Sequence, residues 1–236
     1  MFSSMNQILK YLLSYSSREP LTVDNIALHL NMHKDIVLKT LNKLSNYCQV
    51  DELGRVVIAD DKKVELVLLG VKNGLPMDQA SILLTWHDFE TFIMRVLDYN
   101  DFLTVTNLRI NMRGKRREID IIGCRNELIL CIDAKHWMKT PTRSVLTKMV
   151  EAQKERVTLL SENLRLLYST HILPRRDHFI LIPLVVTLFG RQVTFINNVP
   201  IIPCITLNNF LLNYDFYLEN IWKKEVVIDN LLQYFK

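Results

Sequence analysis

Two largely apolar stretches in the second half of the chain, each interrupted by an aspartate, constrain its fold more than any other feature. The first reads REIDIIG over residues 117–123, and the second reads LILCIDAK over residues 128–135. Both are rich in aliphatic and β-branched residues, which favours strands for runs of this length. The few residues between them, with a turn at Arg125 and Asn126, predict that the two strands form a hairpin.

Three charged side chains lie at one end of this predicted hairpin. Because side chains on a strand alternate between the two faces of a sheet, Asp133 and Lys135 share a face while their apolar neighbours point into the core. Asp120 is expected to point away from the isoleucines on either side of it, and the turn brings it near Asp133. Burying two carboxylates and a lysine is costly, so this end of the hairpin is a candidate functional site.

Phosphodiester hydrolysis is a reaction that uses such a set of groups. Carboxylate oxygens hold Mg²⁺, which keeps coordination positions open for water and for the scissile phosphate. The ion lowers the pKa of its water and offsets charge on the phosphate. In this chemistry Asp120 and Asp133 are the candidate metal ligands. Lys135 would orient the attacking water or stabilise the developing negative charge.

The pattern around the hairpin predicts an α/β domain with a mixed sheet flanked by helices. An amphipathic helix comes before the strand-like runs, a long helix follows the hairpin, and further strands come after it. The expected helices cover residues 86–99 and 145–167, and the expected strands cover residues 103–110, 118–123, 127–132 and 179–188, with a short one near Ile201.

The two stretches together resemble the PD-(D/E)XK nuclease superfamily, particularly its branch of archaeal Holliday junction resolvases and Mrr-type restriction enzymes. The REIDII strand, the Asp-Ala-Lys that ends the second strand and the His-Trp pair after it carry this resemblance, which covers residues 85–215. It implies a restriction-endonuclease-like fold in which Asp120 and Asp133 bind Mg²⁺ or Mn²⁺ and Lys135 is the catalytic lysine.

The same resemblance adds two residues outside the hairpin. Glu90, on the helix before the strands, matches the family's helical glutamate that completes the metal shell. Gln153, on the helix after the strands, matches a glutamine seen in many members. One departure is the third acidic position, where this branch more often has Glu and this chain has Asp133. A second Asp-x-Lys pattern, at residues 61–63, has no acidic strand before it and is therefore not a candidate site.

The first 60 residues contain three short helical patterns followed by two short strands. Thr22 is the expected N-cap of the second helix, and Gly54 supplies the turn between the strands. This order resembles a winged helix-turn-helix. The helices are expected over residues 5–14, 22–30 and 34–47, with Ile36, Val37, Thr40, Leu41 and Leu44 of the third facing inward, and the strands within residues 49–59.

Two basic surfaces are candidate DNA contacts. In a winged helix-turn-helix the third helix enters the major groove and the wing touches the DNA backbone, which favours DNA contact. The alternatives for these residues are a solvated helix face or a docking surface for protein. A basic segment before the Asp120 strand is either a phosphate clamp beside the site or a solvated hairpin tip. The first set is Lys34, Lys39, Asn42, Lys43 and Arg55, and the second is Arg113, Lys115, Arg116 and Arg117.

A connecting helix over residues 61–72, followed by Gly74 and Pro76, predicts two domains, residues 1–75 and 76–236, with further helix from 77 to 85.

The composition, 49% hydrophobic and 23% charged, is typical of a globular protein, and the net charge of +4 permits a nucleic-acid partner without requiring one. The cysteines lack metal-ligand spacing, no signal peptide is indicated and no apolar run is long enough to span a membrane. A soluble, cytoplasmic protein is therefore expected.

Two functions agree with these features. The first is a Mg²⁺-dependent DNA endonuclease of repair or recombination, with the winged helix adding a grip on duplex DNA and, as the resemblance implies, a homodimer as a candidate assembly. The second is a catalytically silent DNA-binding or regulatory protein on a nuclease scaffold. A scaffold is expected to have lost Asp120, Asp133 or Lys135, and all three are present, which favours the enzyme.

Overall fold

The computed structural model divides into two compact units, Met1–Phe92 and Ile93–Lys236. The division falls within one helix, α6 (Trp86–Tyr99), and lies later in the chain than the predicted boundary at residue 75. The residues that the structure describes are 4–15, 20–59, 62–76, 79–80, 83–112, 114–137, 141–188, 190 and 192–228. Part of the helical stretch expected over residues 77–85 therefore lies outside the described residues, and so does Arg113.

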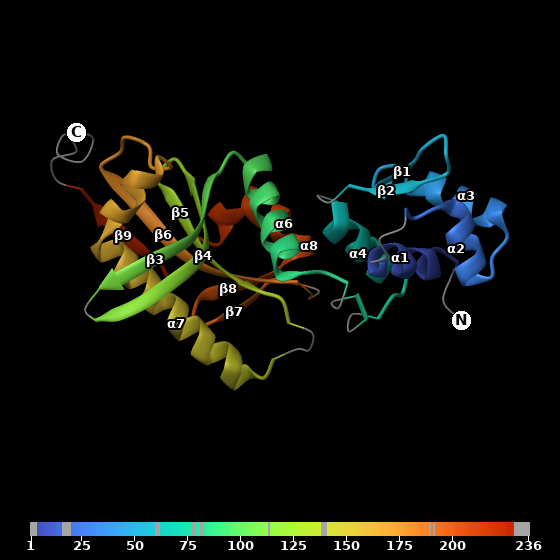
Figure 1. The fold of residues 1–236 in the computed structure, drawn as a ribbon. Helices are drawn as coiled ribbons and strands as arrows, with labels where there is room; N and C mark the ends of the chain where they lie inside the picture. Colours follow the sequence, from blue (N-terminus) through green and yellow to red (C-terminus); the bar gives the residue numbers. More distant parts are fainter. Residues whose placement is uncertain are drawn as a thin grey trace. The chain divides into compact units, whose positions relative to one another are not determined.

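The first unit contains helices and a short two-stranded sheet (Figure 1). Thr22 caps the second helix, because its hydroxyl oxygen accepts a hydrogen bond from the Asn25 N–H at 3.1 Å. The two strands pair antiparallel, and Gly54 in the connecting turn has a φ of 73°, which favours glycine. The elements are α1 (Ser4–Ser14), α2 (Val23–Leu30), α3 (Lys34–Lys43), β1 (Cys48–Val50), β2 (Val56–Ile58) and α4 (Lys63–Lys72).

Helix α3 differs from its prediction in two respects. Four of the five residues expected to face inward are buried, but Ile36 is 45% exposed, so that prediction was wrong. The buried residues, at 37, 40, 41 and 44, already complete one face at helical spacing, and Ile36 lies at its edge. The helix also ends at Lys43 rather than at Tyr47, because the chain turns after Leu44.

Seven strands of the described residues form one sheet in the second unit. Their order is β3-β4-β5-β6-β8-β7, and β9 pairs with β6. The predicted hairpin is present, with β4 antiparallel to both β3 and β5, whereas β5 and β6 are parallel. The sheet is therefore mixed, as expected. The strands are β3 (Leu103–Met112), β4 (Lys115–Arg125), β5 (Leu128–Lys135), β6 (His178–Thr187), β7 (Thr194–Ile196), β8 (Val199–Pro203) and β9 (Lys224–Val227).

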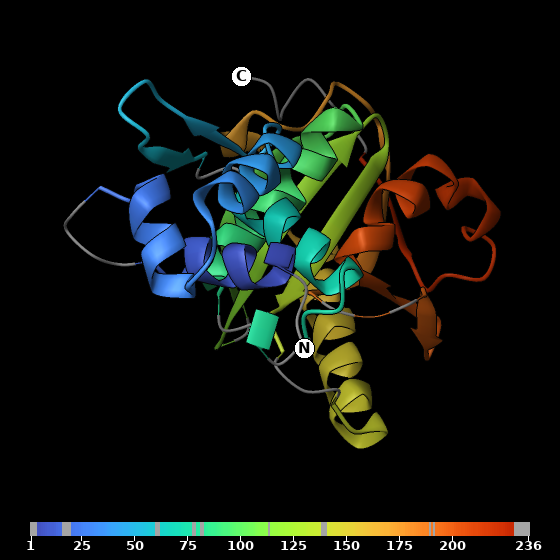
Figure 2. The same ribbon diagram turned by 90° about the vertical axis from the view of Figure 1, so that its right-hand side faces the viewer.

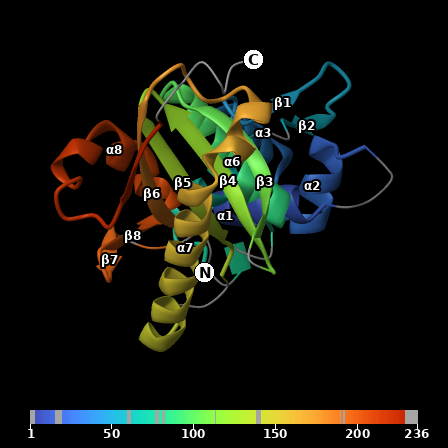
Figure 3. The same cartoon turned by 90° about the vertical axis from the view of Figure 1, so that its left-hand side faces the viewer.

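Helix α7 (Arg143–Glu162) connects the parallel strands β5 and β6 and packs across one face of the sheet. Figures 2 and 3 show this helix beside the strands, with one end extending past them. On the opposite face Leu97 of α6 approaches β4, where a Cβ added to Gly123 would lie 3.3 Å from it. The remaining helical segments are η2 (Leu164–Thr170), α8 (Cys204–Leu212) and η3 (Tyr214–Phe216), and none of the three was predicted from the sequence as a separate element.

The core between α7 and the sheet is apolar. It contains Val157 and Leu160 of the helix together with β-branched residues and cysteines of β4 and β5, among them Ile122, Ile129 and Cys131. All four cysteines of the chain are buried and free. No helix in the described part of the chain has the length and apolar character needed to cross a membrane.

Candidate active site

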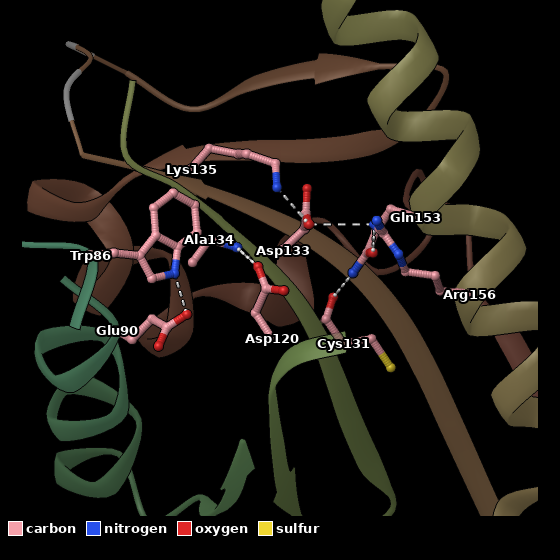
Figure 4. A network of polar contacts seen from close by, with 9 residues as sticks. All are labelled: Trp86, Glu90, Asp120, Cys131, Asp133, Ala134, Lys135, Gln153 and Arg156. Atoms are coloured by element: carbon pink, nitrogen blue, oxygen red, sulfur yellow. Dashed lines mark hydrogen bonds and ion pairs between the residues drawn. The ribbon is translucent and has the colours of Figure 1, made fainter. Parts of the chain in front are cut away.

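The two predicted carboxylates meet where β4 and β5 cease to pair (Figure 4). The pairing ends at Ile121 and Ile132, and the next position along it would place Asp120 opposite Asp133. In place of a further backbone pair, the Asp120 carboxylate accepts a hydrogen bond from the Ala134 N–H, with Oδ2 2.9 Å from the nitrogen. Asp120 therefore lies against the strand that carries Asp133, as the sequence predicts.

Asp133 is buried on the face of β5 that α7 covers, with 2% of its surface exposed. Its Oδ1 accepts hydrogen bonds from Lys135 Nζ at 2.9 Å and from Arg156 Nη1 at 3.3 Å. Its Oδ2 is also buried and has no hydrogen-bond partner among the described residues. Asp133 therefore has one oxygen with two cationic partners and one oxygen that is free to bind a further group.

Helix α7 supports Asp133 through Gln153 and Arg156. The Gln153 side chain is buried, and its Nε2 donates to the Cys131 carbonyl oxygen at 2.8 Å. Its Oε1 accepts from Arg156 Nη1, also at 2.8 Å. The amide thus joins α7 to β5 and orients the guanidinium that reaches Asp133. Arg156 was not predicted, although its position three residues after Gln153 on a helix places the two on neighbouring parts of one face.

Of the two carboxyl groups, Asp120 has a strongly shifted pKa. Burial and, next in size, the negative charge of Asp133 raise the pKa of Asp120 to about 6. The hydrogen bond from Ala134 and the charges of Lys135 and Arg156 act in the opposite direction without cancelling these effects. At neutral pH Asp120 is therefore an ionised carboxylate whose charge its surroundings compensate only in part.

This donor set fits a divalent cation that prefers oxygen ligands, such as Mg²⁺ or Mn²⁺. A cation held by Asp120 and Asp133 would offset their mutual repulsion, and the buried, unpartnered Oδ2 of Asp133 leaves that carboxylate with a free acceptor. Within the described residues, no three side chains of the types His, Cys, Asp and Glu come together as a metal site. The described chain thus supplies a pair of carboxylates at this place rather than a complete shell.

Glu90, the expected third ligand, lies on α6 in the part of that helix assigned to the first unit. Its carboxylate accepts a hydrogen bond from the indole N–H of Trp86, one helical turn earlier (Figure 4). Trp86 was not predicted to take part, although its spacing of four residues from Glu90 on a helix permits the contact. The metal-binding role of Glu90 stays a prediction.

The candidate DNA contacts of the first unit are at its surface. Lys34 forms an ion pair with Asp24 at 2.7 Å, and Arg55 forms one with Asp51 at 2.6 Å. Exposed pairs of this kind are weak and exchange readily with other anions. The other three candidates of this set, Lys39, Asn42 and Lys43, lie on α3, and all three are exposed.

The basic segment forms the end of the β3–β4 hairpin. Because β4 runs antiparallel to β5, the start of β4 and the end of β5 lie at the same end of the strands. The tip of the β3–β4 hairpin is therefore at the end of the sheet where the carboxylates lie. Arg116 is exposed, whereas Arg117 is half-buried and forms an ion pair with Glu155 of α7 at 3.1 Å. Lys115 is the first residue of β4, and Arg113 lies outside the described residues. Arg117 is therefore partly engaged in holding the hairpin against α7.

One comparison with known proteins identifies a relative. The chain is 30% identical over 134 residues to a protein of Archaeoglobus fulgidus whose name is "Uncharacterized protein". The matched part is 56% of this chain and 94% of the archaeal protein, so the two belong to one family. No protein-family model matches the chain. No solved structure matches it either.

Proposed function

We propose that this protein is a metal-dependent DNA endonuclease, with a restriction-endonuclease-like catalytic unit and an N-terminal winged-helix DNA-binding domain. The carboxylate pair Asp120–Asp133 beside Lys135 is the observation that carries the proposal. One carboxylate is buried with an unpartnered oxygen, and the other has a raised pKa. Charged groups kept in such an environment at the end of an apolar strand favour a binding or catalytic role over a structural one.

In this proposal the carboxylates of Asp120 and Asp133 would hold the cation. The ion, when bound, would supply the positive charge that offsets the scissile phosphate and lowers the pKa of the attacking water. Lys135 retains 24% exposure although its Nζ contacts Asp133. The side chain is therefore partly exposed, and its ammonium group would orient the attacking water or stabilise the developing negative charge. The resemblance implies products with a 5′-phosphate and a 3′-hydroxyl.

The other proposed residues act by positioning. Gln153 holds Arg156 and the Cys131 carbonyl together, so it fixes the distance between α7 and the Asp133 strand. Glu90 is the proposed third ligand, and its bond from Trp86 restricts the rotamer of the glutamate. DNA would be held by two basic surfaces, the exposed face of α3 with the wing, and the end of the β3–β4 hairpin. A homodimer would allow both strands of a duplex to be cut.

A catalytically silent DNA-binding or regulatory protein is the second candidate, and one observation favours it. Lys135 and Arg156 both donate to Oδ1 of Asp133, so the protein itself supplies two positive charges to this carboxylate. In a silent scaffold these ion pairs alone would be a sufficient reason to retain Asp133, Lys135 and Arg156. The two candidates make opposite predictions about cleavage.

The test is a cleavage assay on labelled duplex, single-stranded, flapped and four-way-junction DNA with Mg²⁺, Mn²⁺ or EDTA. We expect cation-dependent cleavage by the natural chain, none by Asp133→Ala, and a rate reduced by about 10²- to 10³-fold in Lys135→Ala. DNA affinity should be largely retained in both variants. Asp61→Ala is the matched control, because Asp61 belongs to the second Asp-x-Lys pattern, and this variant should cleave like the natural chain.

Each outcome decides between the candidates. Cleavage that is lost in Asp133→Ala and kept in Asp61→Ala supports the endonuclease. Tight DNA binding without cleavage of any substrate supports the silent scaffold. Cleavage that survives Asp133→Ala contradicts the assignment of the site.

A further inference from the structure

One residue in the middle of β3 has a backbone conformation that strands exclude. Asn107 has a φ of 54°, in the left-handed region, although β3 is described as one strand from Leu103 to Met112. Among residues other than glycine, asparagine and aspartate tolerate this region best. Such conformations cluster at functional sites, where the surrounding structure maintains them. The location of Asn107 in the sheet is therefore informative.

Asn107 lies opposite Asp120. The β3–β4 ladder pairs Thr106 with Ile121 and Leu108 with Ile119, and the position between them is left out of the ladder on both strands. On the other side of β4, the pairing with β5 also stops at Ile121. Asp120 therefore belongs to neither register, although it lies within a strand of the sheet.

The interruption also reverses the alternation of side chains. Ile119 and Ile122 are three residues apart on β4, yet both belong to the apolar cluster under α7. On β3 the same holds for Val105 and Leu108, which pack against that cluster. Strict alternation would place each of these pairs on opposite faces of the sheet. The expectation that Asp120 simply alternates with its two isoleucine neighbours is therefore wrong, because the pleat changes phase at this residue.

The change of phase explains how Asp120 reaches β5. In a regular strand the side chain stands roughly perpendicular to the sheet, away from the N–H groups of the next strand. Here the Asp120 carboxylate lies 2.9 Å from the Ala134 nitrogen and takes the place of a backbone acceptor. That contact holds Asp120 beside Asp133.

We propose that Asn107 is a positioning residue whose left-handed backbone sets Asp120 at the cation-binding place. The proposal rests on the nuclease function proposed above for its kinetic consequence, but not for its structural one. What matters is the backbone conformation, because the side chain of Asn107 is exposed. Glycine, which adopts positive φ without steric cost, should replace it, whereas alanine should not.

The structural consequence can be measured without metal or DNA. The ¹H chemical shift of the Ala134 amide reports its hydrogen bond to Asp120. In Asn107→Gly we expect the natural shift. In Asn107→Ala, where residue 107 is driven toward the strand region, we expect the shift to move toward that of Asp120→Ala. An Ala134 shift that is unchanged in Asn107→Ala, or equally changed in Asn107→Gly, would overturn the proposal.

The kinetic consequence separates positioning from general destabilisation. We expect kcat for DNA cleavage to fall at least about ten-fold in Asn107→Ala, with KM for DNA within about two-fold, because small displacements of a reacting group have effects of this order. Asn107→Gly should have the kcat of the natural chain. The matched control is Asn126→Ala, since Asn126 also has a positive φ, of 56°, but in the turn at the other end of the β4–β5 pairing. It should lose stability without a comparable loss of kcat.

The two readouts fail separately. If the natural chain cleaves no DNA, the proposed function fails, and the amide shift still decides the role of Asn107. Suppose instead that the chain cleaves DNA, and that Asn107→Ala and Asn126→Ala lose kcat in the same proportion to their loss of thermal stability. Asn107 is then an ordinary structural residue, and the inference is wrong.

Discussion

The two ends of strand β5 lie in one sheet, and both contain buried side chains, but their chemistry is opposite. From Leu128 to Ile132 every residue is apolar and buried, whereas the last three residues include Asp133, which is 2% exposed, and Lys135. Burial of one aliphatic side chain at the first end contributes about 1.5–3 kcal/mol to stability. Burial of an ionised carboxylate costs several kcal/mol, of the order of 3–5 when it is left unpaired. One end of the strand contributes apolar burial, and the other end carries the desolvation cost of charged groups.

The polar end is tolerated because its charges are partly compensated. Lys135 and Arg156 bind one oxygen of Asp133, and the Ala134 N–H binds Asp120. The compensation is incomplete, as the raised pKa of Asp120 shows. A group retained at such a cost is typical of sites that bind a ligand, where function is maintained at the expense of stability.

The largest expected effect comes from making the apolar end resemble the polar one. Ile129 is fully buried at the first end of β5. We expect Ile129→Asp to lower the free energy of unfolding by more than about 4 kcal/mol, because it buries a charge without partners. Urea unfolding followed by circular dichroism measures this. Asp133→Ala is the matched variant at the other end, and it should remain folded; equal destabilisation by the two substitutions would remove the distinction between the ends.

A smaller effect is expected from the pH dependence of stability in EDTA. Because the folded-state pKa of Asp120 is about 6, above its ordinary value of 3.8, the folded protein binds this proton more tightly than the unfolded chain does. The contribution of Asp120 to the free energy of unfolding should therefore fall by about 2–3 kcal/mol as pH rises from 4 to 6 and stay level above that. Asp120→Asn should remove this decrease.

The comparison of Asp120→Asn with the natural chain checks the sign. The two proteins should have similar stability near pH 4, where the carboxyl is protonated in the folded state, and the variant should be the more stable one above pH 6. A variant that is less stable than the natural chain at pH 7 would show that the Asp120 charge stabilises the metal-free fold, contrary to this account.

The smallest effect concerns the basic residues at the tip of the β3–β4 hairpin. Replacing Arg113, Lys115, Arg116 and Arg117 together by alanine should lower the slope of log affinity for DNA against log salt by about one for each phosphate that the protein no longer neutralises. Arg176 is the control, because it forms an ion pair with Glu127 at the opposite end of the strands, near the start of β5. Arg176→Ala should leave the slope unchanged. An unchanged slope in the fourfold variant would assign the hairpin end to solvent.

Much of the fold follows from sequence pattern. The α6 helix was predicted with its observed bounds, and the β4–β5 hairpin was predicted because two apolar runs with a short gap leave few alternatives. The meeting of Asp120 with β5 followed from the same pattern. Helix α8 and strand β9 were not predicted, because their short apolar runs lack a clear period and their pairing depends on the sheet already being in place.

The supporting residues of the site were harder to predict for a physical reason. Arg156 takes part only because α7 crosses the face of β5 that carries Asp133, which is a tertiary relation. The left-handed conformation of Asn107 depends on the partner strand, and an asparagine within a strand-like sequence does not by itself predict a positive φ. The turn glycine Gly54, by contrast, was predictable because its conformation is a local requirement.

The most direct test of the cation site is Mn²⁺ binding to the metal-free protein, measured by isothermal titration calorimetry. We predict one Mn²⁺ per chain for the natural protein and for Asp61→Asn, and affinity at least about ten-fold weaker in both Asp120→Asn and Asp133→Asn. Mn²⁺ binding that is equally strong in all four proteins would contradict the account, since the cation would then be held elsewhere.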